Sequence, residues 1–347
     1  MATTLSDIAR RAHCSVNLVS YVLRKEGPPT KEKHREILRI ARELNYGSCR
    51  TQRAEKPRTW LVTMFVNASE ARKPSAFFSN FLTECIQQFS KEGIGVTLYP
   101  FDNEHSETQL SRAERMADGY LWYMCAPDSK TASLLRDKQL PSLCLYLPES
   151  ELRTLPFETD YLTIDDYTGF YNLASFLYRL HHRNIVYAAP DPAGVRYEAY
   201  LQFCRDNHLP PRPVLNAIPN ADFKNRDALQ QYISRNGRCF TALLCVNDEV
   251  AVSLLYVLKS LDIKVPDEIT VVGYDDRPCA SQCTPSLTTI RQNYREIISQ
   301  AVSFLTFRIE HPGEPKRLQA VYTQELVKRG SAGWAQERGG KAENRNA

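Results

Sequence analysis

From Trp60 onward, short apolar segments alternate with longer amphipathic segments, and this alternation constrains the fold more than any other feature of the chain. The apolar segments include "WLVTMFV", "IGVTLYPF" and "YLWYMC", and between them lie "FFSNFLTECIQQFSKEG" and "ETQLSRAERMADG". Such a rhythm predicts parallel strands joined by helices. It starts again after "YLTIDD", so we expect an α/β protein with two doubly wound parallel-sheet halves rather than one long sheet.

The last part of the chain carries one more helix, one more strand and a polar tail. The helix is expected from Gln292 to about Ile309, and the strand in "LQAVYTQEL". The tail, residues 331–347, contains few apolar side chains and is expected to be disordered. The overall composition, 43% hydrophobic and 24% charged residues, is typical of a soluble globular protein.

Residues 1–58 form a basic segment on an otherwise slightly acidic chain. They contain 13 lysines and arginines against 6 acidic residues, a net charge of +7, so the other residues carry −3 of the total of +4. A small basic module beside a mildly acidic body is typical of a nucleic-acid-binding head.

Helical spacing predicts three short helices in this head. The apolar positions of the first and third helices recur every three or four residues: Leu5, Ile8, Ala9 and Ala12, then Ile37, Leu38, Ala41 and Leu44. In the second helix, "SVNLVSYVL", Ser15 can cap the first turn. Only "HCS" separates the first two helices, which favours a helix-turn-helix whose second helix enters the major groove. A three-helix bundle with a basic surface and no ligand is the alternative.

Little in the sequence indicates an enzyme. There is no phosphate-binding glycine loop and no GxSxG motif, and the ten cysteines include no CxxC pair. Asp166 and Asp276 complete Asp-Asp pairs that could serve acid-base chemistry, but helix capping explains pairs that follow strands. We therefore expect no catalytic residues, no cofactor and no metal. Because neither a leader nor an apolar run of bilayer length is present, we expect a cytoplasmic protein without membrane contact.

Motifs along most of the chain resemble the lactose repressor (LacI/GalR) family of bacterial transcription regulators. The head "TLSDIARRAHCSVNLVSYVL" is similar to the helix-turn-helix of that family. Further matches follow in the family's order from Leu5 to Gly330: "ADGYLW", "LTIDDYTG", "HRNIVYAA", "VRYEAY", "TALLCVNDEVAVSLLYVLKSLDIKVPDEITVVGYDD", "PSLTTIRQ" and "ELVKRGS". The resemblance implies a periplasmic-binding-protein-like type I body with a small effector in its cleft, in a homodimer that binds a palindromic operator.

The resemblance also implies a division of the chain into parts, because folds of this type exchange strands between their halves. The head would cover residues 1–46, an atypical hinge or linker 47–58, and the effector-binding and dimerisation domain 59–330. The N-subdomain would comprise about 59–160 plus 291–321, and the C-subdomain about 161–290 plus 322–330. In the linker, Glu55 stands where the family places a leucine that wedges into the minor groove. A carboxylate is repelled there, so we expect a flexible basic tether instead of a leucine wedge.

Seven residues of the head occupy positions that contact DNA in this family: Thr4, Leu5, Ser15, Val16, Asn17, Ser20 and Tyr21. The chemistry suits that role, because Asn17 can pair with an adenine edge and Val16 can contact a thymine methyl group. Ser20 and Tyr21 can bond to bases or phosphates. Tyr21 stands where the family often has Arg or His, so we expect an operator sequence of this chain's own.

Four polar residues follow predicted strands in the body and are candidates for binding the effector: Asn67, Arg196, Asn247 and Asp275. Ligands of doubly wound sheets lie at the carboxyl ends of the strands. A carboxylate accepts from vicinal hydroxyls while Arg and Asn donate to oxygens, which suits a sugar or a nucleoside-like ligand. Three of the four, Arg196, Asn247 and Asp275, also match effector contacts of the family. A capped helix or a surface ion pair would explain each residue taken alone.

These observations together predict a ligand-responsive DNA-binding repressor of carbohydrate-utilisation genes that is controlled by a sugar-like effector. A cytoplasmic α/β enzyme acting on a sugar or nucleoside, with the basic head used for docking, is the alternative. A sugar-binding protein without a DNA function is a third possibility, against which the intact head argues.

Overall fold

The computed structural model describes residues 4–16, 18–19, 22, 32–44, 58–72, 76–101, 116–147, 149–152, 155, 159–311 and 317–336. The chain divides into two compact units, residues 1–59 and 60–347. The linker expected over residues 47–58, and with it Glu55, lies outside the described residues except for Arg58. The helix predicted in "ETQLSRAERMADG" falls largely on residues that are not described either.

The head contains helices α1 (Leu5–Arg11) and α3 (Glu32–Glu43), with helical residues between them at 16, 18–19 and 22. Thr4 caps α1, because its hydroxyl accepts from the backbone N–H of Asp7 while the Asp7 carboxylate accepts from the backbone N–H of Thr4. The apolar faces pack into one small core that consists of Ile8, Ala9, Ala12, Val19, Val22, Ile37, Ile40 and Ala41. The spacing of apolar residues therefore located most of this core.

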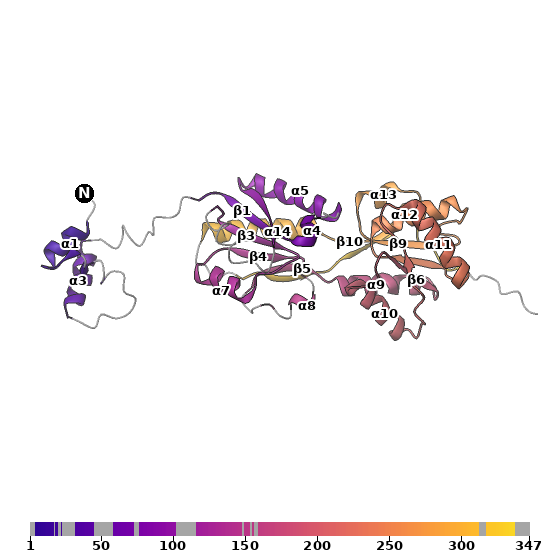
Figure 1. The fold of residues 1–347 in the computed structure, drawn as a ribbon, viewed down its shortest axis with the longest axis horizontal. Coiled ribbons are helices and arrows are strands. Elements are labelled where there is room, and N and C mark those ends of the chain that lie inside the picture. The colour runs from indigo at the N-terminus through magenta and orange to yellow at the C-terminus, as the bar shows by residue number, and fades with distance from the viewer. Residues whose placement is uncertain are drawn as a thin grey trace, which may run out of the picture. The chain divides into compact units, whose positions relative to one another are not determined.

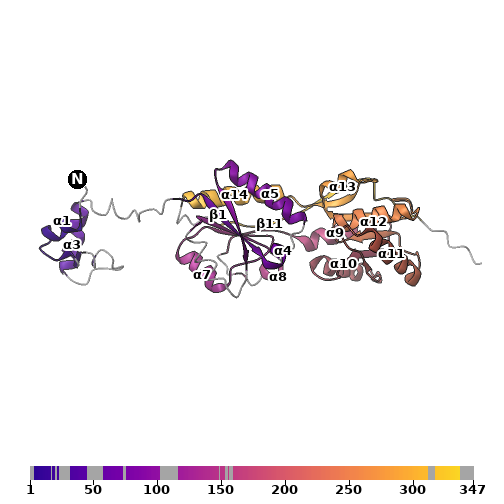
Figure 2. The ribbon, with the colours of Figure 1, turned by 45° about the horizontal axis from the view of Figure 1, so that its top comes forward.

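The body is built on two sheets of six strands each (Figure 1). The first sheet has the order β11-β5-β4-β3-β1-β2, and its strand pairs are parallel: β1 (Leu61–Asn67), β2 (Gly95–Phe101), β3 (Gly119–Tyr123), β4 (Ser142–Leu145), β5 (Tyr161–Ile164) and β11 (Gln319–Tyr322). Helices α5 (Ala76–Lys91) and α14 (Tyr294–Glu310) cover one face, and α7 (Ser129–Asp137) covers the other (Figure 2). Two short helices, α4 (Ala68–Arg72) and α8 (Glu149–Leu152), complete this half.

The second sheet has the order β12-β10-β9-β8-β6-β7, and only β12 is antiparallel to its neighbour. Its strands are β6 (Ile185–Ala189), β7 (Leu215–Asn216), β8 (Ala242–Cys245), β9 (Thr270–Asp275), β10 (Thr288–Arg291) and β12 (Glu325–Val327). Helices α9 (Asp166–Arg179) and α10 (Val195–Asp206) cover one face, and α11 (Asp222–Asn236) and α12 (Asp248–Ser260) cover the other. A short helix, α13 (Pro278–Gln282), follows β9. The predicted fold class of two parallel α/β subdomains is confirmed.

The chain passes between the two sheets three times, after β5, after β10 and between β11 and β12. The predicted last strand is therefore two short strands, one in each sheet, separated at Thr323 and Gln324. The last helix returns to the first sheet, where Ile297, Ala301 and Leu305 are fully buried. These crossings place the residues that follow β5, β9 and β10 close to one another.

The prediction that residues 331–347 are disordered was wrong for the first part of that tail. Ser331 is fully buried, and its hydroxyl donates to the carbonyl of Val271 in β9 at 2.6 Å. The backbone of Ala335 donates to the carbonyl of Leu180, and the Trp334 ring lies against His181. Most of these contacts involve backbone groups, so the polar composition of the segment gave no sign of them.

Candidate functional site

Arg196 lies at the centre of a polar cluster at the carboxyl edge of the second sheet. It stands in the first turn of α10, and its Nη1 donates to the carbonyl of Val246 at 2.7 Å. Its Nη2 lies 3.3 Å from carboxylate oxygens of both Asp166 and Asp275. The guanidinium carbon lies 4.0 Å from the centroid of the Tyr274 ring. Burial disfavours the charge, but Asp166 and Asp275 more than offset this, so the pKa of Arg196 is raised.

Asp166 is the second member of this cluster. It is the first residue of α9, the helix that follows β5. Its Oδ1 accepts a hydrogen bond from the Tyr274 hydroxyl at 2.8 Å, in addition to its contacts with Arg196. The preceding residue, Asp165, has a different role, because its carboxylate caps α9 by accepting from the backbone N–H of Thr168 at 2.9 Å. The capping explanation of this Asp-Asp pair therefore holds for Asp165, whereas Asp166 contacts Arg196.

Asp275 ends β9 and is the most enclosed carboxylate of the cluster, with 9% of its surface exposed. Besides Arg196, it contacts Gln292, whose Nε2 donates to Oδ1 at 2.6 Å. Burial raises the pKa of Asp275 to about 6, although the Arg196 charge counteracts the effect. Its φ of 110° lies in the left-handed region, where strain in non-glycine residues is often associated with function.

Several buried polar atoms near this cluster have no hydrogen-bond partner among the described residues, and they include the hydroxyl of Tyr146 and the Oε1 atom of Gln292. Tyr146 follows β4 of the first sheet, has a φ of 57°, and is 8% exposed. Burial raises its pKa well above the usual value, and the charges of Asp166 and Asp275 contribute to the shift. An unpaired buried polar group costs about 1–3 kcal/mol, so these atoms are expected where a ligand completes their hydrogen bonds.

The other two predicted effector residues, Asn67 and Asn247, also lie at the carboxyl ends of strands, but neither is seen to contact Arg196 or Asp275. Asn67 ends β1, and its Nδ2 donates weakly to the carbonyl of Met124 at 3.5 Å. Asn247 caps α12, because its Oδ1 accepts from the backbone N–H of Val250 at 3.0 Å. The structure thus brings Arg196 and Asp275 into direct contact, whereas Asn67 donates to the backbone after β3 and Asn247 caps its own helix.

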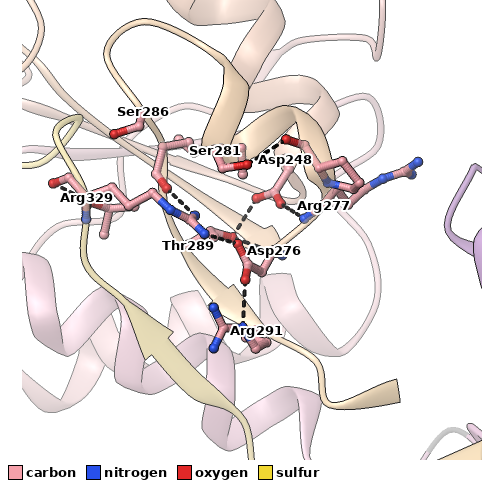
Figure 3. A network of polar contacts seen from close by, with 12 residues as sticks. Asp248, Asp276, Arg277, Ser281, Ser286, Thr289, Arg291 and Arg329 are labelled. Carbon is pink, nitrogen blue, oxygen red and sulfur yellow. Dashed lines mark hydrogen bonds and ion pairs between the residues drawn. The ribbon is translucent and has the colours of Figure 1, made fainter. Parts of the chain in front are cut away.

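A second charged network lies beside the cluster and ties the crossing segments together (Figure 3). Asp276 accepts from Nε of Arg291 at 2.7 Å and from Nη2 of Arg329 at 2.5 Å. Arg291 also donates to Glu325 at 3.1 Å. Because Arg291 ends β10 and Glu325 begins β12, Asp276 connects the end of β9 to two segments that lead to or from the first sheet. The adjacent residues Asp275 and Asp276 therefore serve different networks.

Asp248 belongs to the same network and is fully buried. Its two oxygens accept from the Thr289 hydroxyl at 2.6 Å and from the backbone N–H of Arg277 at 2.7 Å. Burial, with a further contribution from the Asp275 charge, raises its pKa from 3.8 to about 8. The folded chain therefore binds this proton more tightly than the unfolded chain does. The resulting stabilisation is fully present below pH 3.8 and is lost as the pH rises through about 8.

Asp248→Asn is therefore expected to make the protein less sensitive to alkaline pH. Between pH 7 and 9 the wild type should lose about 1 kcal/mol of unfolding free energy from this carboxyl, and the variant should not. Urea unfolding at both pH values measures the difference. Asp137→Asn removes a carboxylate that is 72% exposed on α7 and should leave the pH profile unchanged. Equal profiles for the wild type and Asp248→Asn would contradict the assignment.

The predicted DNA-contacting residues of the head are only partly described. Thr4 caps α1, and the Ser15 hydroxyl accepts from the backbone N–H of Leu18 at 3.2 Å, which is the cap expected from the sequence. Leu5 is half-buried against the head core, and Val16 is 41% exposed. The other three, Asn17, Ser20 and Tyr21, lie outside the described residues.

Sequence reasoning did not assign an effector role to Asp166, Gln292 or Tyr146. Tyr146 directly follows β4 and Asp166 lies two residues after β5, and a position at a strand end is the signal that identified Asp275. Gln292 lies in "PSLTTIRQ", just after β10. In the part of the chain that the structure describes, no group of three or more His, Cys, Asp or Glu side chains could hold a metal, and no helix is long and apolar enough to cross a membrane.

Several known proteins with similar sequences or folds are transcription regulators. Residues 174–332 match the model of the periplasmic binding protein-like domain. A relative from Histophilus somni, the HTH-type transcriptional repressor PurR, is 24% identical over 339 residues, covering 94% of this chain and 98% of the relative. The structure of the transcriptional regulator CelR with cellobiose has a TM-score of 0.61 at 21% identity and covers 95% of this chain and all of that one. The lac repressor dimer bound to operator and the anti-inducer ONPF has a TM-score of 0.61 at 20% identity, with coverage of 96% and 100%.

Proposed function

We propose that the chain is a LacI-family transcriptional regulator that represses carbohydrate-utilisation genes, and that a sugar-like effector bound at the Arg196 cluster controls it; the similarity to known repressors over nearly the whole chain supports this proposal. Under this proposal the chain is a ligand-responsive DNA-binding regulator and not an enzyme, like the repressor to which it is similar. The observation that carries the sugar proposal is a pair of buried oxygens, those of Tyr146 and Gln292, that lie beside two carboxylates and have no partner in the part of the chain that the structure describes.

The chemistry of this set favours a ligand with several hydroxyl groups. Asp166, Asp275 and the Oε1 atom of Gln292 are hydrogen-bond acceptors, whereas Arg196 donates to both carboxylates. A sugar hydroxyl both donates and accepts, so neighbouring hydroxyls can satisfy acceptors and donors at once. The similar CelR structure holds cellobiose, which supports the same ligand class. Asn67 and Asn247 are proposed as additional contacts from the strand ends.

The proposed macromolecular partner is a palindromic double-stranded operator, bound by a homodimer. The basic head and its short helices support DNA binding. Within the head, Thr4, Leu5, Ser15, Val16, Asn17, Ser20 and Tyr21 are proposed to contact the operator. The similar lac repressor structure is a dimer on its operator. Effector binding changes operator affinity only if the ligand prefers one of two body conformations.

Operator binding and its response to ligands test this function directly. The full chain is titrated by fluorescence anisotropy with DNA from upstream of its own gene, at several salt concentrations, and then with a panel of sugars, purine bases and nucleosides. The proposal predicts a site-specific complex whose affinity falls steeply with salt and changes with one or more sugars. A response to purines alone would replace the sugar proposal, and no specific complex with DNA would contradict the proposed operator.

The variant Tyr146→Phe tests whether the Tyr146 hydroxyl contacts the effector or stabilises the fold. The change removes a hydroxyl that has no partner among the described residues, so the melting temperature of the free protein should stay the same or rise. Effector affinity should fall about tenfold, which corresponds to one lost hydrogen bond. Calorimetric titration and thermal unfolding measure the two quantities.

Tyr200→Phe is the matched control for this variant. Tyr200 is also buried, but its hydroxyl donates to the carbonyl of Ile185 at 3.0 Å and accepts from the backbone N–H of Arg212 at 3.2 Å. Its removal should lower the melting temperature and leave effector affinity unchanged. If Tyr146→Phe behaves like this control, Tyr146 does not contact the effector.

A further inference from the structure

The charges around Arg196 do not cancel, and the surplus is negative. The one guanidinium lies 3.3 Å from each of two carboxylates, Asp166 and Asp275. Its remaining contacts are the carbonyl of Val246 and the face of the Tyr274 ring. Arg196 is thus already engaged on every side that the structure describes, and its side chain is only 18% exposed.

The other charged groups near the cluster leave this surplus in place. Asp276 is paired with Arg291 and Arg329, and Arg277 is paired with Glu249 at 3.0 Å. These arginines are therefore occupied by partners of their own. An anionic ligand at this site would meet two carboxylates at short range and a guanidinium that both of them already neutralise.

Asp166 contributes to the negative charge around Arg196 more directly than Asp165 does. Its carboxylate contacts Arg196 and accepts from Tyr274, and its side chain is 25% exposed. Asp165, one residue earlier, carries the same charge but uses its carboxylate to cap α9. Substitution of either residue removes one negative charge at the start of α9, but only substitution of Asp166 removes a carboxylate that contacts Arg196.

We propose that Asp166 is a specificity-determining residue that neutralises Arg196 and so restricts the effector site to uncharged, hydroxyl-rich ligands, excluding phosphorylated or carboxylated ones. The inference rests on the proposed effector site and specifies the charge of its ligand. Removing this carboxylate leaves Arg196 with one acidic partner in place of two, which should admit an anion.

The test measures the binding of inorganic phosphate to the full chain by calorimetric titration at constant ionic strength. Asp166→Asn should bind phosphate at least ten times more tightly than the wild type. Asp165→Asn changes the net charge of the chain by the same amount and retains a capping side chain, so it should bind phosphate like the wild type. Addition of Arg196→Gln to Asp166→Asn should abolish the gain. Asp166→Ser serves as a second variant if Asp166→Asn does not fold.

Each outcome separates this inference from the proposed function. Equal phosphate affinity in Asp166→Asn and Asp165→Asn, or tight phosphate binding by the wild type, would overturn the role of Asp166. If uncharged sugars bind the wild type but the variants gain no phosphate affinity, the inference fails and the sugar effector stands. If Asp166→Asn gains phosphate affinity while no sugar binds any form, the sugar proposal fails and the charge selection by Asp166 stands.

Discussion

Asp275→Asn is expected to weaken effector binding at least ~100-fold while the body remains folded. The Asp275 carboxylate lies between Arg196 and Gln292, where a ligand would meet it. Hydrogen bonds to a charged group contribute about 1.5–3 kcal/mol each, so two bonds from ligand hydroxyls account for this factor. Asparagine has nearly the same shape, and its side-chain oxygen can still accept from Gln292. Calorimetric titration with the effector measures the loss.

Asp276→Asn is the control for this variant because it removes the neighbouring carboxylate. Asp276 faces Arg291 and Arg329 rather than Arg196, so its loss leaves two arginine contacts uncompensated. We expect a lower melting temperature and an effector affinity within about threefold of the wild type, since no proposed ligand contact is removed. If both variants lose affinity equally, the separation of the two networks at the end of β9 is wrong.

The sequence allowed many strands of both sheets to be predicted because their cores are short apolar runs, although β4, β7 and β10 were not identified. β3 and β6 are buried along their whole length, and helices with polar outer faces separate the strands. It also located Arg196 and Asp275 at one site, since the carboxyl ends of parallel strands meet at one edge. The resemblance to a family supplied the exchange of strands between the halves, which apolar periodicity alone does not reveal.

Other features of the site could not be read from the sequence because they depend on contacts between distant residues. Asp166 is recognisable as a carboxylate after a strand, but its partner Arg196 is 30 residues away. Asn247 carried the same positional signal, yet its side chain caps α12. Tyr146 resembles the other aromatic residues of the core, and only its three-dimensional surroundings leave its hydroxyl without a partner among the described residues. Position after a strand thus selected candidates without distinguishing their roles.

Val19→Asp is expected to abolish operator binding, by more than ~100-fold, and to leave effector binding unchanged. Val19 is fully buried in the head core with Ile8 and Ile37. Placing an ionised carboxylate there costs several kcal/mol, and a core of this size supplies only about 3–5 kcal/mol. The head should therefore unfold. Because residues 1–59 and 60–347 form separate compact units, the body should keep its melting temperature and its effector affinity.

Val16→Ala distinguishes the surface of the same helical segment from its core. Val16 is 41% exposed, so its truncation should leave the helical content of the head unchanged. A lost contact with a thymine methyl group would lower operator affinity about fivefold to tenfold, near the lower limit for one base contact. Anisotropy titrations at a fixed salt concentration and circular dichroism give both readings. Normal operator binding by Val19→Asp would show that the head does not depend on Val19 for its core. Normal operator binding by Val16→Ala would show that the surface that contacts DNA lies elsewhere on the head.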